Sequence, residues 1–262
     1  MKLAITGKGG VGKTTLAALL AYVFAERGQK VLAIDADPAR GLAAACGVPA
    51  EQAAAITPVA DMEDLIYERT GARKGEIGGY FKLNPRVDDI PDRFAVSPPG
   101  HAAEGRIRIL AMGTVKTGGA GCLCPENALL RSLVAHLLLR RDEVLIMDME
   151  AGVEHLGRGT AGAVDAFIVV VEPGRRSIQT AHAIHALAQD LGIGQVYAVG
   201  NKVVSASDEA FIAEQMPGFQ VLGFLPSDPN AIEADRSGLA VFALAPELVT
   251  RANAIVDRLT TL

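Results

Sequence analysis

A glycine-rich stretch near the start of the chain carries lysine and threonine at a spacing that suits phosphate chemistry. Residues 7–15 read Gly-Lys-Gly-Gly-Val-Gly-Lys-Thr-Thr and fit the pattern G-x-x-x-x-G-K-[ST]. In this pattern the loop backbone surrounds a polyphosphate, the lysine reaches the outer phosphates and the first hydroxyl binds Mg²⁺. The predicted nucleotide-binding residues of the loop are therefore Gly9, Gly10, Val11, Gly12, Lys13, Thr14 and Thr15.

The elements on either side of this loop support the interpretation. Residues 3–6 predict a short apolar strand and residues 16–24 predict an apolar helix, which is the strand–loop–helix context that the pattern requires. The positive end of the helix would point at the same phosphates. Residues 30–35 predict a second buried strand, and this β-α-β order favours a parallel sheet. A glycine-rich turn in an ordinary α/β domain is the alternative.

Carboxylates follow two of the predicted strands. Asp148 ends the apolar run 144–148, where open α/β sheets bind their ligands, and a carboxylate there can hold a Mg²⁺-bound water. Gly152 could then donate its N–H to the γ-phosphate and move when that phosphate leaves. Asp35 and Asp37 lie at the matching end of the neighbouring strand. Helix capping is the alternative role for each aspartate.

A short polar pair in the second half of the chain indicates which nucleotide base the protein would bind. A strand predicted over 195–199 ends in residues 200–202, which include Asn201 and Lys202, and an asparagine amide can pair with the N6/N7 edge of adenine. Guanine-binding loops extend to N-K-x-D, whereas Val204 stands at the aspartate position here. The sequence therefore favours ATP, with an asparagine turn as the alternative.

Two of the three cysteines have a spacing that suits metal binding. Cys122 and Cys124 would point to one side of an extended segment, so both sulfurs can face one ion. Two thiolates do not fill a tetrahedral site, but a two-fold dimer would supply four. The alternative is two small residues in a turn. Cys46, among alanines, is expected in the core.

The whole chain reads as one α/β domain. It has 262 residues, 50% of them hydrophobic, a mean hydropathy of +0.26, a net charge of −5 and a pI of about 5.6. These values predict a globular cytoplasmic protein and argue against general nucleic-acid or membrane binding. No signal peptide or membrane-spanning run is visible. We expect a single-domain P-loop NTPase over 1–262, with a mostly parallel central sheet and helices on both faces. Further strands are predicted at 107–112, 166–171 and 219–224, and helices at 61–70, 125–138, 177–191 and 246–262.

Taken together, five segments resemble a known family. Residues 7–15, 35–38, 121–127, 148–160 and 201–203 look like the CooC family, the nickel-insertion ATPases that mature carbon monoxide dehydrogenase. These belong to the MinD/ParA class with a deviant Walker A loop, of which residue 8 is the distinguishing lysine. The Cys-x-Cys pair and the E-H-L-x-R-G-T segment narrow the resemblance to this family.

The resemblance implies a mechanism as well as a fold. Lys8 would cross a homodimer interface to the partner's nucleotide, and Asp37, with help from Asp35, would orient the attacking water. Lys8, Lys13, Asp37 and Asp148 would then be the catalytic residues of a Mg²⁺-dependent ATPase. The two Cys-x-Cys pairs would hold Ni²⁺ or Zn²⁺ between subunits, and hydrolysis would reopen the dimer and deliver nickel to the apo-enzyme.

Three other families share this architecture. A nitrogenase-iron-protein relative would need a cysteine in residues 149–152, and there is none. A MinD/ParA positioning ATPase would need a membrane or DNA anchor, and the tail 246–262 is a poor basic amphipathic helix. A maturation ATPase for another nickel enzyme, such as acetyl-CoA synthase, stays open as an alternative.

Overall fold

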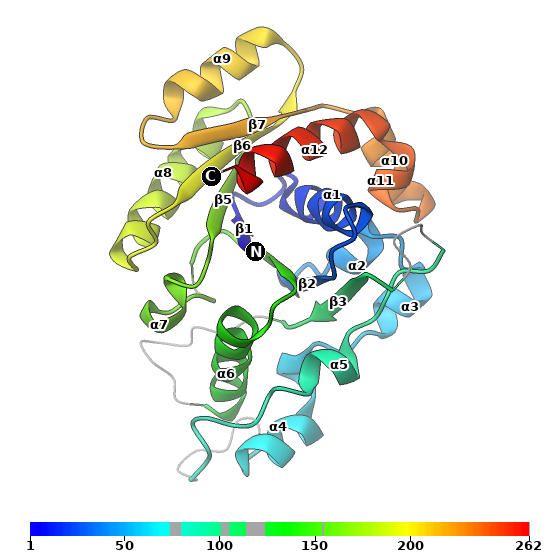
Figure 1. Ribbon diagram of the computed structural model, residues 1–262, viewed down its shortest axis with the longest axis vertical. Helices are drawn as coiled ribbons and strands as arrows, with labels where there is room; N and C mark the ends of the chain where they lie inside the picture. Colours follow the sequence, from blue (N-terminus) through cyan, green and yellow to red (C-terminus); the bar gives the residue numbers. More distant parts are fainter. Residues whose placement is uncertain (74–79, 101–104, 114–123, 154, 262) are drawn as a thin grey trace.

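Seven parallel strands form a single sheet in the order β3-β2-β4-β1-β5-β6-β7 (Figure 1). The computed structural model describes residues 1–73, 80–100, 105–113, 124–153 and 155–261. The strands are β1 Lys2–Thr6, β2 Val31–Ala36, β3 Ile107–Ala111, β4 Val144–Met149, β5 Ala166–Val171, β6 Val196–Val203 and β7 Gln220–Pro226. Every strand pairing in this sheet is parallel, which confirms the predicted fold class.

Apolar side chains alternate between the two faces of the sheet, and helices cover both. Leu3 and Ile5 of β1 join one buried cluster, whereas Ala4 joins the other. Because both faces are buried, the strands read as continuous apolar runs. The first face is covered by α1 Lys13–Glu26, α2 Leu42–Ala45, α10 Pro229–Ser237, α11 Val241–Leu244 and α12 Pro246–Thr260.

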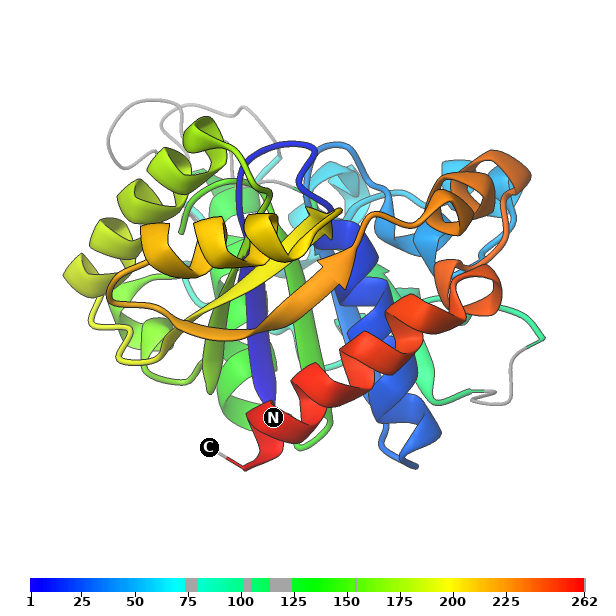
Figure 2. The same ribbon diagram turned by 90° about the horizontal axis from the view of Figure 1, so that it is seen from above.

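The second face carries the remaining helices that contribute buried residues. They are η1 Val59–Asp61, α4 Glu63–Thr70, α5 Ile90–Phe94, α6 Pro125–Arg140, α7 Arg158–Ala161, α8 Arg175–Asp190 and α9 Ala206–Gln215. The short helix α3 Ala50–Ala55 has no buried residue. Figure 2 shows the two layers, with α12 lying beside α1 on one side and α8 on the other.

The strand order sets the position of the site. β1 lies between β4 and β5, and the connections leave this point toward opposite edges of the sheet. Ligands of open α/β sheets bind at such a switch point, outside the carboxyl ends of the strands. The phosphate loop follows β1, and Asp35 and Asp148 are register partners at the same ends of β2 and β4.

Several boundaries differ from those that the sequence predicts. β6 begins at Val196 and continues to Val203, one residue beyond the Asn201-Lys202 pair that the sequence predicts at the end of this strand. The predicted helix 61–70 is divided into η1 and α4. Short helices α9 and α10 follow side-chain caps at Ser205 and Asp228, a signal that hydrophobic periodicity does not show. None of the helices in the described ranges is long and apolar enough to span a bilayer.

Candidate nucleotide-binding site

The amino terminus of α1 is open toward the phosphate loop. Gly12 is its N-cap residue and provides no side-chain hydrogen bond, and the first helical bond runs from Leu16 N to Gly12 O at 3.0 Å. The first N–H groups of a helix have no partner within the helix, so here they face the loop. A polyphosphate is the ligand that these amides and the helix dipole suit best.

Two glycines of the loop stand where a side chain does not fit. A Cβ at Gly7 would lie 2.4 Å from Val170 O, and a Cβ at Gly12 would lie 2.1 Å from Asn201 Nδ2. Gly12 also has φ of +93°, in the left-handed region that side chains avoid. The spacing of the glycines therefore has a steric cause, since the loop is pressed against β5 and β6.

Asn201 holds this loop in place. Its Nδ2 donates to Val11 O at 2.7 Å, and its Oδ1 accepts from Lys202 N at 2.8 Å. Lys202 adds a second link, because its Nζ donates to Gly10 O. One Nδ2 hydrogen and one Oδ1 lone pair of Asn201 are left over by these bonds. Adenine recognition by Asn201 stays a prediction that this geometry allows.

Thr14 and Asp148 meet at the mouth of the loop. Thr14 Oγ1 donates to Asp148 Oδ2 at 2.7 Å, and Asp148 Oδ1 is buried with no hydrogen-bond partner among the described residues. A hydroxyl beside a carboxylate with an unsatisfied oxygen suits Mg²⁺, which prefers oxygen ligands and retained waters. The pKa of Asp148 is raised to about 7, chiefly by burial and also by the neighbouring Asp35, while the Thr14 hydrogen bond opposes this shift.

Asp35 and Asp37 have different partners. Asp35 accepts backbone N–H groups of Leu42 at 3.0 Å and of Asp37 at 3.3 Å, so both its oxygens hold the turn after β2. Burial raises the pKa of Asp35 to about 6. Asp37 Oδ2 lies 3.6 Å from Lys13 Nζ, on the loop side. Of the two, Asp37 is the one whose carboxylate faces the predicted phosphate site, and its role toward water stays a prediction.

The segment after Asp148 is tied to β1. Gly152 N donates to Thr6 Oγ1 at 3.1 Å, and the same hydroxyl donates to Glu150 O at 2.8 Å. The predicted donation from Gly152 to a γ-phosphate therefore requires this bond to open. The sequence analysis missed Thr6, although a hydroxyl at the end of the strand before a phosphate loop is a detectable feature.

Lys8 makes an ion pair within its own subunit. Its Nζ lies 3.3 Å from Glu172 Oε1, and Lys202 Nζ lies 3.8 Å from Glu172 Oε2. The sequence analysis missed Glu172 too. Its position gave the same kind of signal that identified Asp148, a carboxylate at the end of an apolar strand, because Glu172 directly follows β5.

The two predicted metal-binding cysteines are only partly described. Cys122 lies outside the described residues, and Cys124 is the half-buried N-cap residue of α6. Cys124 borders a cavity of about 320 Å³ that Leu83 and Asn84 also line. Within the described part of one chain, no group of three or more His, Cys, Asp or Glu residues could hold a metal ion. Cys46 is buried, as expected.

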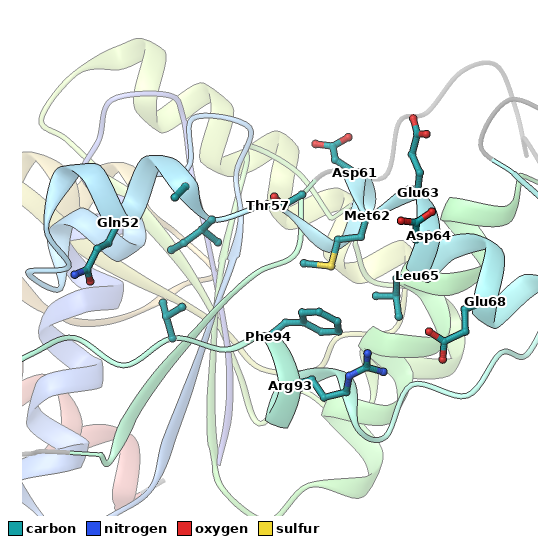
Figure 3. Close-up of a pocket in the computed structure, with 13 residues that line it drawn as sticks. Gln52, Thr57, Asp61, Met62, Glu63, Asp64, Leu65, Glu68, Arg93 and Phe94 are labelled. Atoms are coloured by element: carbon teal, nitrogen blue, oxygen red, sulfur yellow. The ribbon is translucent and has the colours of Figure 1, made fainter.

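A cavity of about 880 Å³ lies apart from the phosphate loop (Figure 3). Met62, Leu65 and Phe94 supply apolar side chains, while Asp61 and Glu63 point outward at its border. None of the predicted site residues lines this cavity. The candidate nucleotide site at the loop and strand ends is therefore separate from this cavity.

These features define a phosphate-loop nucleotide-binding protein on a parallel α/β sheet. The chain belongs to the CobQ/CobB/MinD/ParA nucleotide-binding domain family, whose model matches residues 2–241.

Curated relatives cover nearly the same length. The carbon monoxide dehydrogenase accessory protein CooC of Rhodospirillum rubrum is 48% identical over 259 residues, which cover 99% of this chain and 96% of that protein. An uncharacterised ATP-binding protein of Methanocaldococcus jannaschii is 45% identical over 91% of this chain and 90% of its own length. The MinD septum site-determining protein of Pyrococcus horikoshii, solved with Mg-ADP, has the same fold, with a TM-score of 0.66, 17% identity and coverage of 98% of this chain and 95% of that one.

Proposed function

We propose that this chain is a Mg²⁺-dependent ATPase that serves as a nickel-delivery factor in the maturation of carbon monoxide dehydrogenase. The observation that carries the proposal is the Thr14–Asp148 pair beside the open end of α1, in a chain that is 48% identical to the CooC accessory protein along nearly its whole length. ATP is favoured because Asn201 lies against the loop without a following aspartate at position 204. The proposed location is the cytoplasm, where ATP is available.

The residues of the loop and strand ends would divide the work of hydrolysis. The loop amides and Lys13 bind the phosphates, and Lys13 is directed there by Asp37 at 3.6 Å. Thr14 and Asp148 would hold Mg²⁺, which when bound neutralises charge that develops on the phosphoryl oxygens. Asp37 orients the attacking water. Gly152 exchanges its Thr6 partner for the γ-phosphate and so reports whether that phosphate is present.

A homodimer would complete both the catalytic site and the cargo site. Lys8 of each subunit reaches the partner's nucleotide, where a cation stabilises the transferring phosphoryl group. Cys122 and Cys124 from two subunits supply the four thiolates that a tetrahedral site needs. Ni²⁺, with Zn²⁺ as the alternative ion, is the cargo. Hydrolysis separates the subunits and frees the ion for the apo-enzyme.

A positioning role like that of MinD is the second candidate, and α12 itself does not offer the membrane anchor that such a role would use. The apolar side of this last helix packs on α1 and β7 through Leu248, Ala252, Ile255, Val256 and Leu259, all of which are buried. A helix with its apolar side in the core cannot also insert that side into a membrane. Delivery to another nickel enzyme, such as acetyl-CoA synthase, would use the same site, and the choice between clients rests on the comparison with CooC.

A reconstitution assay tests the proposal. Purified apo carbon monoxide dehydrogenase is incubated with limiting nickel, ATP and either the parent protein or Lys13→Ala. We expect ATP-dependent activation with the parent and none with the variant, whereas Arg251→Ala on the exposed side of α12 serves as the control and should behave like the parent. Equal activation by Lys13→Ala, or by the parent without ATP, would refute coupling of hydrolysis to delivery.

A further inference from the structure

Glu172 occupies a fixed position at the carboxyl end of β5. Its N–H donates to Ser177 Oγ at 3.1 Å, and its carbonyl accepts from Gly174 N at 2.7 Å. These bonds hold the turn that leads into α8 and leave the side chain directed at the phosphate loop. The side chain is 29% exposed, so it is neither buried in the core nor free in solvent.

Two lysines share the carboxylate of Glu172. Lys8 Nζ lies 3.3 Å from Oε1, and Lys202 Nζ lies 3.8 Å from Oε2 while it also donates to Gly10 O. Lys202 is one of two non-glycine residues with positive φ in the described chain, at +57°. It therefore adopts an uncommon backbone conformation at the place where its side chain meets the loop. Glu172 thus links Lys8 of the loop to Lys202 of β6, two residues that are far apart in the sequence.

We propose that Glu172 is a positioning residue that holds Lys8 within its own subunit until two subunits close. The inference rests on the proposed function, in which Lys8 acts across the dimer interface. In the proposed closed dimer, the Lys8 side chain turns across the interface to the partner's phosphates and so leaves Glu172 of its own chain. Closure therefore exchanges one ionic partner of Lys8 for another, and Glu172 opposes closure until nucleotide phosphates replace it.

The size of the effect follows from the exposure of the pair. Lys8 is 38% exposed and Glu172 29%, and partly exposed ion pairs shift an equilibrium by about 2- to 5-fold. A symmetric dimer must break two such pairs, so removing both should tighten dimerisation by about 4- to 25-fold. Salt screens partly exposed charges, and the gain should shrink as ionic strength rises.

The experiment compares dimer dissociation constants, measured by sedimentation with a slowly hydrolysed ATP analogue. Glu172→Gln removes the charge and keeps the shape of the side chain. The matched control is Asp257→Asn, which breaks a partly exposed ion pair with Arg27 at the opposite end of α1. We expect the dimer of Glu172→Gln to be about 4- to 25-fold tighter than the parent at low salt, with Asp257→Asn unchanged. An unchanged or weaker Glu172→Gln dimer overturns the inference.

Two further variants separate this inference from the proposed function. Lys8→Ala should fail to dimerise measurably, and if it dimerises like the parent, the trans role of Lys8 itself is wrong. In a Lys8→Ala background, Glu172→Gln should not restore measurable dimerisation, because it acts through the lysine. A gain that persists without Lys8 would show that Glu172 only adds repulsion at the interface, and would overturn the positioning role.

Discussion

Asp148→Asn should make the nucleotide-free protein more stable while it weakens metal binding. Asn keeps the shape of the side chain and an acceptor for the Thr14 hydroxyl, but carries no charge. Burial raises the pKa of Asp148 from 3.8 to about 7, so the folded chain holds a proton that the unfolded chain releases. The stability from this proton is complete below the unfolded pKa and is lost as the pH rises through the folded one.

The expected magnitude comes from the size of this shift. One pKa unit equals about 1.4 kcal/mol, so ionised Asp148 lowers the free energy of unfolding by up to about 4 kcal/mol above pH ~7. Between about pH 5 and about pH 8, the stability of the variant relative to the parent should therefore rise by about 2–3 kcal/mol. Titrating groups far from Asp148 contribute to both proteins and largely cancel in this difference.

Urea unfolding without nucleotide, in the presence of a chelator, measures this difference at the two pH values. Asp235→Asn, at an exposed position on α10, is the control for the same chemical change made away from the site. Mg²⁺ affinity in the presence of ADP should fall about 10- to 100-fold in Asp148→Asn. A stability difference for Asp148→Asn that does not change with pH would refute the claim that Asp148 is buried and holds a proton in the folded protein.

Other substitutions test the remaining parts of the site. Gly12→Ala places a Cβ 2.1 Å from Asn201 Nδ2 at φ of +93°, so it should cost about 1–3 kcal/mol in stability and abolish nucleotide binding, as measured by thermal melting and ADP titration. Lys13→Ala should stop ATP hydrolysis in a phosphate-release assay, and normal turnover would refute the role of Lys13 and its loop in binding the phosphates. Cys122→Ser and Cys124→Ser should each lose the bound nickel while the fold survives. Nickel affinity of the parent should fall as the pH drops, because the ligands are thiolates; a pH-independent affinity would point to other ligands.

The sequence predicts the parts of this site that depend on local chain order. A strand, a glycine-rich loop and a helix follow one another directly, so Lys13 and Thr14 could be assigned from the pattern alone. Asp148 was identified because parallel strands bring their carboxyl ends together at one edge. The register between Asp35 and Asp148 confirms that reasoning.

Contacts between distant segments could not be predicted in the same way. Glu172 is 164 residues from Lys8, and Asn201 is 190 residues from the Val11 carbonyl that it binds. Such pairs depend on how β5 and β6 lie beside the phosphate loop in the folded protein, and the spacing of residues along the chain does not encode this arrangement. The amide of Asn201 shows the consequence, since a residue predicted to read adenine also turns out to support the loop. The helices α9, α10 and α11 were missed because they are short, and α9 and α10 are signalled by their side-chain caps rather than by a long apolar pattern.

Nickel stoichiometry in the closed pair is the measurement that tests the central claim most directly. Native mass spectrometry of the protein with Ni²⁺ and a slowly hydrolysed ATP analogue reports chains, nucleotides and metal ions in one species. A metal site between two subunits predicts two chains, two nucleotides and about one nickel ion per dimer, with the nickel lost when Cys124 is replaced by serine. Nickel bound to single chains as readily as to pairs, or retained by the serine variant, would contradict a metal site that two subunits share.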